Sequence, residues 1–352
     1  MQLLAMTAPP AVGIMFDTSL SRVDDALALA LLYGLDGKRE LRVVSMSVSR
    51  SSIHAAAYCD AVGRFYAGEV SGAIGATGRT LPIGLATGST LKDDLALFTA
   101  PLDRKNAAGK PAYVTDIQDV LDTADPVAVI RNAFTAQWDD NSVLVLSGPA
   151  TSLARLLDVP SAKALAARKV RLLVFAGGAF PDGDPDTNIK ADIPAARKLF
   201  AEWPTPIVMA GRELGQSVLF PATSVEKDFA WSPAHPVVDA YRANQPMPYD
   251  APTQTMAAVL YAGRPKDGYF KLSDAGNVAV LDDGRVKFTP SASGKQRYLI
   301  FDPAQKDRIL KTYTEVASAK PVPPPPRRPR PPVQQPPPPP VPVTPAQQQK
   351  PS

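Results

Sequence analysis

The chain has 352 residues, with 38 Lys and Arg against 34 Asp and Glu. The segment 321–352 holds 16 of the 38 prolines and four of the basic residues, which leaves 34 basic and 34 acidic residues in 1–320. This balance argues against a nucleic-acid-binding surface, because phosphate binding needs clustered, unbalanced Lys and Arg. The longest apolar run, 26–35, is about half of what a bilayer requires, so we expect no membrane span.

Cys59 is the only cysteine, which excludes an intrachain disulfide and a multi-thiolate metal site. The only histidines are His54, expected on a helix, and His235, expected in a surface loop between prolines, and neither is expected to be catalytic. The apolar start, 1–11, lacks the charged beginning of a signal peptide. The sequence as it stands indicates a cytoplasmic protein, whereas a start codon further upstream would allow export.

Strand and helix patterns alternate through the first two thirds of the chain, with short apolar runs between longer helical patterns. We expect strands over 12–16, 41–48, 81–86, 143–146, 170–175 and 206–210. We expect helices over 24–35, 53–66, 126–138, 151–157 and 194–200, and a loop with a short helix over 91–124. This alternation predicts a Rossmann-like α/β fold, a mainly parallel open sheet covered by helices on both faces.

The pattern changes after residue 210. We expect a helix over 255–261, an antiparallel β-hairpin over 278–289 that turns at Asp282, Asp283 and Gly284, and an amphipathic closing helix over 303–317. The expected organisation is a flexible N-terminus over 1–11, an α/β domain over 12–319 and a disordered Pro-rich tail over 320–352. The proline runs of the tail favour an extended polyproline II arm.

Polar residues follow several expected strands, where open parallel sheets bind their ligands. Asp17, Asp24 and Asp25 surround the first of these turns, and carboxylates grouped in this way repel unless a cation or a polyol holds them. Alternatively, Asp24 and Asp25 only favour the first turn of a helix through its dipole. Later turns contribute 147–152 and the segment from Gly177 to Asp192.

Together these segments resemble the inosine–uridine-preferring nucleoside hydrolases. The family motif Asp-Thr-Asp-Pro-Gly-x-Asp-Asp-Ala is similar to 17–26, and Thr-Gly-Pro-Leu-Thr-Asn is similar to 147–152. Met-Gly-Gly is similar to 176–178, and Glu-Phe-Asn-x-x-x-Asp-Pro-Glu-Ala-Ala to 186–196. The resemblance extends over about 13–261, and a bacterial branch of the family also ends in a β-hairpin.

The resemblance implies calcium-dependent hydrolysis of the N-glycosidic bond of a ribonucleoside, or of a related N-ribosyl compound, to free base and ribose. Calcium takes hard oxygen ligands, holds ribose hydroxyls and positions a water that a carboxylate deprotonates. The implied roles are Asp17 and Asp24 as catalytic residues, Asp24, Asp186 and Asn188 in substrate binding, and Asp25, Ser147, Asp17 and Asp250 as metal ligands. Phe180, close after Gly178, is expected on the rim of the pocket as a further substrate contact.

The sequence departs from the family at two metal-ligand positions. Ser19 stands where the family has an aspartate that is both a calcium ligand and the proposed base, so an active enzyme needs Asp17 or Asp24 as its base. For the last ligand, an ungapped alignment selects Thr255 and an alignment on the His-Asp pair of the family selects Asp250. Each lost carboxylate weakens a calcium site, so calcium binding is expected to be weakened or lost.

The sequence favours the first of three functions, and the other two are alternatives to it. The first is an N-glycosyl hydrolase with a divergent metal site, and the second is a catalytically silent nucleoside or ribose binder of the same fold. The third is an interaction protein whose tail offers PxxP ligands to an aromatic groove. The expected partner is a small nucleoside, the family resemblance implies a homo-oligomer, and the base preference stays open.

Overall fold

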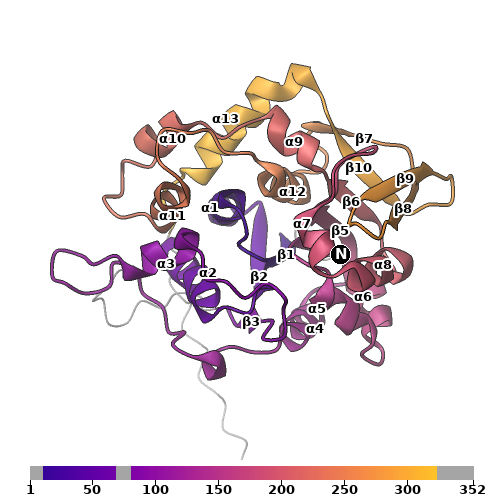
Figure 1. Ribbon diagram of the computed structural model, residues 1–352, viewed down its shortest axis with the longest axis horizontal. Helices are drawn as coiled ribbons and strands as arrows, with labels where there is room; N and C mark the ends of the chain where they lie inside the picture. Colours follow the sequence, from indigo (N-terminus) through magenta and orange to yellow (C-terminus); the bar gives the residue numbers. More distant parts are fainter. Residues whose placement is uncertain (1–10, 69–80, 323–352) are drawn as a thin grey trace, which may run out of the picture.

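The computed structural model describes residues 11–68 and 81–322 (Figure 1). Residues 1–10 and 323–352, which hold most of the expected N-terminal extension and of the Pro-rich tail, lie outside the described residues. None of the helices in the described ranges combines the length and the apolar character that a membrane crossing requires.

The described strands form one sheet in the order β3-β2-β1-β4-β5-β6-β10-β8-β9, and β7 pairs with β10. Its parallel part is made by β1 (Val12–Thr18), β2 (Leu41–Val48), β3 (Ile83–Leu85), β4 (Ser142–Ser147), β5 (Val170–Ala176) and β6 (Ile207–Ala210). Every residue of β1 and β4 is buried, as in a sheet covered on both faces. The predicted mainly parallel sheet with helices is confirmed.

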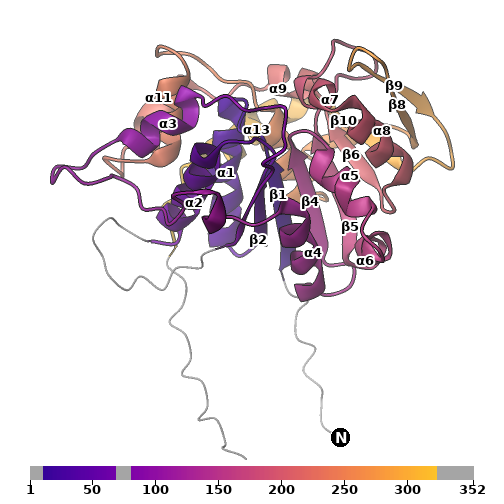
Figure 2. The same ribbon diagram turned by 60° about the horizontal axis from the view of Figure 1, so that its bottom comes forward.

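Helices cover both faces of the sheet (Figures 1 and 2). One group contains α1 (Val23–Gly37), α2 (Ile53–Tyr66), α3 (Ala96–Asp103), α11 (Pro236–Asn244), α12 (Gln254–Gly263) and α13 (Lys306–Ala317). The other contains α4 (Pro126–Ala136), α5 (Thr151–Leu157), α6 (Ala162–Lys169) and α8 (Ile193–Glu202). Helix α1 is buried almost all round because it contacts α11, α12 and α13 as well as β2, which explains its continuous Ala and Leu run.

The C-terminal strands differ from the expectation of a separate antiparallel appendage. Strand β10 (Gln296–Phe301) pairs in parallel with β6 and antiparallel with β7 (Phe270–Leu272) and β8 (Gly276–Val280). The predicted hairpin is present, since β8 pairs with β9 (Val286–Pro290), but β10 joins it to the main sheet. The pattern of β10 itself did not predict this strand, because its residues alternate only weakly in burial.

Several short helices also lacked a sequence signal: α7 (Thr187–Ala191), α9 (Arg212–Ser217) and α10 (Ala222–Lys227) are each a turn or two long. They build the loops that follow β5 and β6 and lead toward α11. Such short helices carry too few residues for a helical period to be visible in a sequence.

His235 is buried, so its expected place in a surface loop is wrong. It caps α11, and its Nδ1 accepts a hydrogen bond from the amide of Val237 at 3.3 Å. The rings of Phe65, Phe229 and Trp231 surround it, with centroid distances from 4.7 to 5.5 Å. Burial lowers the pKa of His235 to about 3, which keeps the imidazole neutral.

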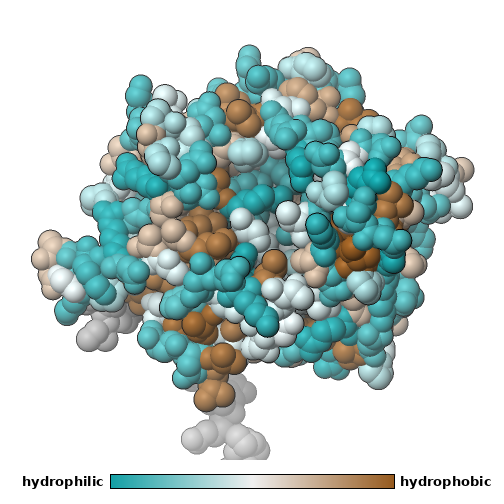
Figure 3. Space-filling view, in the orientation of Figure 1, coloured by the Kyte–Doolittle hydropathy of each residue, from teal (hydrophilic) through white to brown (hydrophobic). Residues whose placement is uncertain are grey.

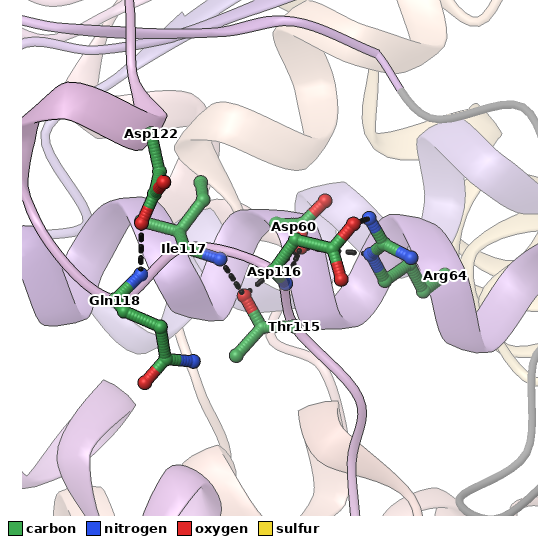
Figure 4. Close-up of polar contacts among 7 residues, drawn as sticks. All are labelled: Asp60, Arg64, Thr115, Asp116, Ile117, Gln118 and Asp122. Carbon is green, nitrogen blue, oxygen red and sulfur yellow. Dashed lines mark hydrogen bonds and ion pairs between the residues drawn. The ribbon is translucent and has the colours of Figure 1, made fainter.

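The long segment between α3 and α4 is fastened to α2 by a polar cluster around Asp60 (Figure 4). Asp60 Oδ2 accepts hydrogen bonds from Arg64 Nε at 2.8 Å, Thr115 Oγ1 at 2.9 Å and the Asp116 amide at 3.1 Å. Asp60 and Arg64 are both buried, so their charges depend on this pairing.

We expect Asp60→Ala to lower the free energy of unfolding by about 3 kcal/mol, because it removes one partner of a buried ion pair. The matched control is Asp122→Ala on the same segment, an exposed carboxylate that accepts only from the amides of Gln118 and Asp119. Urea unfolding of the three proteins measures the difference. Equal losses for the two variants would show that the Asp60 cluster does not hold the segment.

Candidate active site at the carboxyl ends of β1 and β4

The candidate site lies where the strand order of the sheet reverses. Strand β1 lies between β2 and β4, and in open parallel sheets the carboxyl ends of the strands at such a switch point are where ligands bind. Thr18 is opposite Ser147 in the β1–β4 pair, and the amide of Ser19 donates to the carbonyl of Ser147 at 3.1 Å. Figure 3 shows this side of the molecule, where hydrophilic residues predominate around the centre with small hydrophobic patches between them.

Asp17, at the end of β1, is a buried carboxylate with one oxygen free. Its Oδ2 accepts from the Ser47 hydroxyl at 2.6 Å, while Oδ1 has no hydrogen-bond partner among the described residues. Burial raises the pKa of Asp17 to about 7, and the hydroxyls of Ser47 and Ser49 offset only part of that effect. Asp17 therefore exchanges a proton near neutral pH and has an acceptor atom available.

Asp25, in the first turn of α1, is fully buried, and both of its carboxylate oxygens accept hydrogen bonds. Its Oδ1 accepts from the hydroxyl of Ser147 and from Thr255 Oγ1, the latter at 2.8 Å. Its Oδ2 accepts from the amide of Arg22 at 3.2 Å. The carboxylate thus joins the start of α1 to β4 and to the first turn of α12.

Asp24 is bonded in a different way, by the backbone at the start of α12. Its two oxygens accept from the amides of Thr255 and Met256, the latter at 3.2 Å. Burial raises the pKa of Asp24 to about 6, although the charge of Arg22 and the hydrogen bonds from these two amides act to lower it. The carboxylate satisfies amides that the end of a helix leaves unpaired.

Two arginines also lie in the site. Arg22 Nη1 donates to Gln254 Oε1 at 2.6 Å, and Nη2 donates to Thr255 Oγ1 at 3.2 Å. Arg50 donates from Nε to the carbonyl of Ser19 at 2.9 Å and from Nη2 to Ser21 Oγ at 3.0 Å. Burial acts to lower the pKa of Arg22, but the charges of Asp25, Asp24 and Asp186 outweigh it and raise the pKa.

The loop after β5 adds two polar side chains. Asp186 caps α7 by accepting from the amides of Asn188 at 2.9 Å and Ile189 at 3.1 Å. Asn188 Oδ1 accepts from Ser19 Oγ at 3.4 Å, and the same hydroxyl is 3.3 Å from the carbonyl of Ser147. The loops after β1, β4 and β5 therefore meet at Ser19.

Backbone geometry holds the first loop in place. Leu20 has a φ of 47°, a left-handed conformation that costs about 1 kcal/mol for a non-glycine residue, and its side chain is fully buried. Gly148 has no space for a side chain, since an added Cβ would lie 2.0 Å from Ser49 Oγ and 3.1 Å from the Ser19 amide. The strain at Leu20 and the close approach at Gly148 together fix where Ser19 and Arg22 lie.

The structure brings Asp17, Asp24, Asp25, Ser147, Asp186 and Asn188 to this edge of the sheet. It places two other candidates elsewhere. Asp250 is exposed and accepts from the amide of Ala222 at the start of α10, and Thr255 rather than Asp250 lies against Asp25. Phe180 is buried and stacks on Tyr298 of β10, with ring centroids 4.8 Å apart.

Sequence reasoning missed Arg22, Ser47 and Gln254. The available signal for Arg22 was a single basic residue directly before a pair of aspartates at the start of a helix. Ser47 occupies an inconspicuous place near the end of β2. Gln254 lies more than 200 residues from Arg22 in the chain, so no local pattern joins them.

The donor set does not fit a bound calcium ion. Both oxygens of Asp24 and of Asp25 already accept hydrogen bonds from protein groups, and the Arg22 side chain lies among the acids. Ser19 brings a hydroxyl in place of a carboxylate. Within residues 11–68 and 81–322, no group of three or more His, Cys, Asp or Glu side chains is arranged to hold a metal ion.

We expect the stability gained by Asp17→Asn to depend on pH. Between about pH 4, where an unfolded aspartate ionises, and about pH 7, the unfolded chain loses a proton that folded Asp17 retains, so rising pH destabilises the wild type. The free energy of unfolding of Asp17→Asn relative to wild type should therefore increase between pH 4 and 7 and then level off. Urea unfolding across this range measures it, and a difference independent of pH would contradict the raised pKa.

No family model matches the sequence, and a search among curated proteins finds no relative. Solved structures do match. An inosine–uridine-preferring nucleoside hydrolase from Bacillus anthracis superposes with a TM-score of 0.63 at 17% identity, over 87% of this chain and 99% of that one. A purine-preferring ribonucleoside hydrolase from Gardnerella vaginalis gives 0.63 at 18% identity, over 87% of this chain and 98% of that one.

A plant nucleoside hydrolase gives a TM-score of 0.62 at 18% identity, over 88% of this chain and the full length of that one. The expected resemblance at the level of the fold is confirmed: this chain has the nucleoside hydrolase fold.

Proposed function

We propose that this protein hydrolyses the N-glycosidic bond of a ribonucleoside, or of a related N-ribosyl compound, to free base and ribose. The observation that carries the proposal is the gathering of buried carboxylates, Asp17 with a free oxygen among them, at the point where the strand order reverses. The fold supports it, since its structural neighbours are named as nucleoside hydrolases with purine or inosine–uridine preference.

Asp17 is the general base in this proposal. Its ionised carboxylate accepts a proton from water through Oδ1 while the water oxygen bonds to the anomeric carbon of the sugar. The bond between that carbon and the base nitrogen breaks, its electron pair leaves with the base, and the base takes up a proton. A pKa of about 7 suits this task, because such a carboxylate is both ionised and basic near neutral pH.

The transition state carries positive charge on the sugar ring. The charges of Asp24, Asp25 and Asp186 are offset only in part by the single positive charge of Arg22, and the negative charge that remains favours this transition state. Asn188 directs its carboxamide oxygen toward Ser19, which leaves its NH₂ group to donate to a ribose hydroxyl. The proposal includes no step through calcium, because Ser19 replaces a carboxylate ligand of the family and both oxygens of Asp25 are bonded within the protein.

A catalytically silent binder of nucleosides or ribose is the second candidate. Complete bonding of Asp24 and Asp25 favours it, since these carboxylates need no ligand to be satisfied. The Oδ1 of Asp17, which has no hydrogen-bond partner among the described residues, still offers a polar contact to a bound sugar.

We expect the wild type to release ribose from at least one member of a panel of purine and pyrimidine nucleosides, with a rate that rises through about pH 7 as Asp17 ionises. Asp17→Asn should lower kcat by about 10²-fold or more, the usual contribution of a general base. Reducing-sugar release measures both effects.

The matched control is Asp282→Asn, a carboxylate at the exposed hairpin turn that pairs with Arg197 and should leave the rate unchanged. Absence of ribose release from every nucleoside, combined with a rise in melting temperature on adding one of them, would replace the hydrolase by the binder. Full activity in Asp17→Asn would remove Asp17 as the base.

A further inference from the structure

A positive charge from within the chain lies close to the acids of the site. Arg22 is the residue before α1, and its guanidinium reaches the first turn of α12, where it bonds Gln254 Oε1 at 2.6 Å and Thr255 Oγ1 at 3.2 Å. Thr255 Oγ1 in turn donates to Asp25 at 2.8 Å. The positive charge is therefore one hydroxyl away from the most deeply buried carboxylate.

The geometry of these bonds requires arginine. The two Nη atoms reach different acceptors on consecutive residues of one helix, a fork that the single ammonium of lysine cannot reproduce. The Nε of Arg22 is buried and has no partner among the described residues, so one donor of the guanidinium remains for a ligand or a water.

The charges close to Arg22 come from three acids, since Asp25, Asp24 and Asp186 all act on its guanidinium. A divalent ion at the same place would have to displace this guanidinium, break its bonds to α12 and strip the hydroxyls from Asp25. Arg22 supplies one positive charge beside these three acids, so part of their charge is offset without an ion from water.

We propose that the Arg22 guanidinium is the resident cation of this site, so that the site assembles and binds its ligand without a divalent metal. The inference holds for a hydrolase and for a binder alike, because it concerns how the acids are held. The experiments that test it measure calcium affinity and thermal stability. Their results can therefore be interpreted even if the protein shows no hydrolase activity.

The first experiment uses the wild-type chain. Its melting temperature is measured with excess EDTA and with CaCl₂ up to about 10 mM, above the dissociation constants of weak protein calcium sites, and calcium binding is followed by calorimetry. The expected result is one melting temperature in all conditions and no heat of binding. A melting temperature that rises with calcium, with saturable heat, would overturn the proposal.

The second experiment removes the charge with Arg22→Gln, which keeps a polar side chain of similar reach. We expect a lower melting temperature that is partly restored by millimolar methylguanidinium but not by the same concentration of NaCl. Arg22→Lys should recover less than methylguanidinium, because it restores charge without the fork. The control is Arg212→Gln, an exposed arginine that bonds the carbonyl of Pro185, for which neither loss nor rescue is expected.

An Arg22→Gln variant as stable as the wild type would overturn the proposal, and so would equal rescue by both salts. If Arg22→Gln does not fold, the calcium titration of the wild type still decides between a resident guanidinium and a metal site.

Discussion

The buried carboxylate of Asp25 constrains the whole carboxyl edge of the sheet. A fully buried charge is tolerated only when hydrogen bonds satisfy it, and Asp25 takes them from the loop before α1, from β4 and from α12. Each hydrogen bond to a charged group contributes about 1.5–3 kcal/mol to the free energy of unfolding. Loss of one partner here would leave part of a buried carboxylate without a hydrogen bond. Three segments distant in the chain must therefore meet at one point.

That requirement explains the unusual loop after β1. Leu20 accepts a left-handed backbone because burial of its side chain offsets the strain, and the chain then turns so that Arg22 can face α12. With Arg22 in this position its positive charge acts on Asp24, Asp25 and Asp186. Asp17 is not among the acids that act on Arg22, and its Oδ1 has no hydrogen-bond partner among the described residues.

The motifs that follow strands predicted which polar residues gather at one edge of the sheet, because the carboxyl ends of parallel strands meet there. The sequence did not predict the hydrogen bonds that hold these acids. The choice between Thr255 and Asp250 as the neighbour of Asp25 depends on how the loop before α12 packs, and two alignments of the sequence selected different residues. Phe180 followed a glycine pair in the expected place, yet its ring turned away to stack on Tyr298, a residue of the strand that the sequence did not reveal.

The sequence by itself determined the alternation of strands and helices, the parallel sheet and the edge at which its polar loops gather. These features follow from the periodicity of apolar residues, which is visible among residues close together in the chain. Only the tertiary structure decided that β10 joins the hairpin to β6, that His235 is enclosed by aromatic rings, and that Arg22 binds Gln254 and Thr255. These outcomes depend on pairings between residues far apart in the chain, and the free energy of such contacts has no signature in the sequence around either partner.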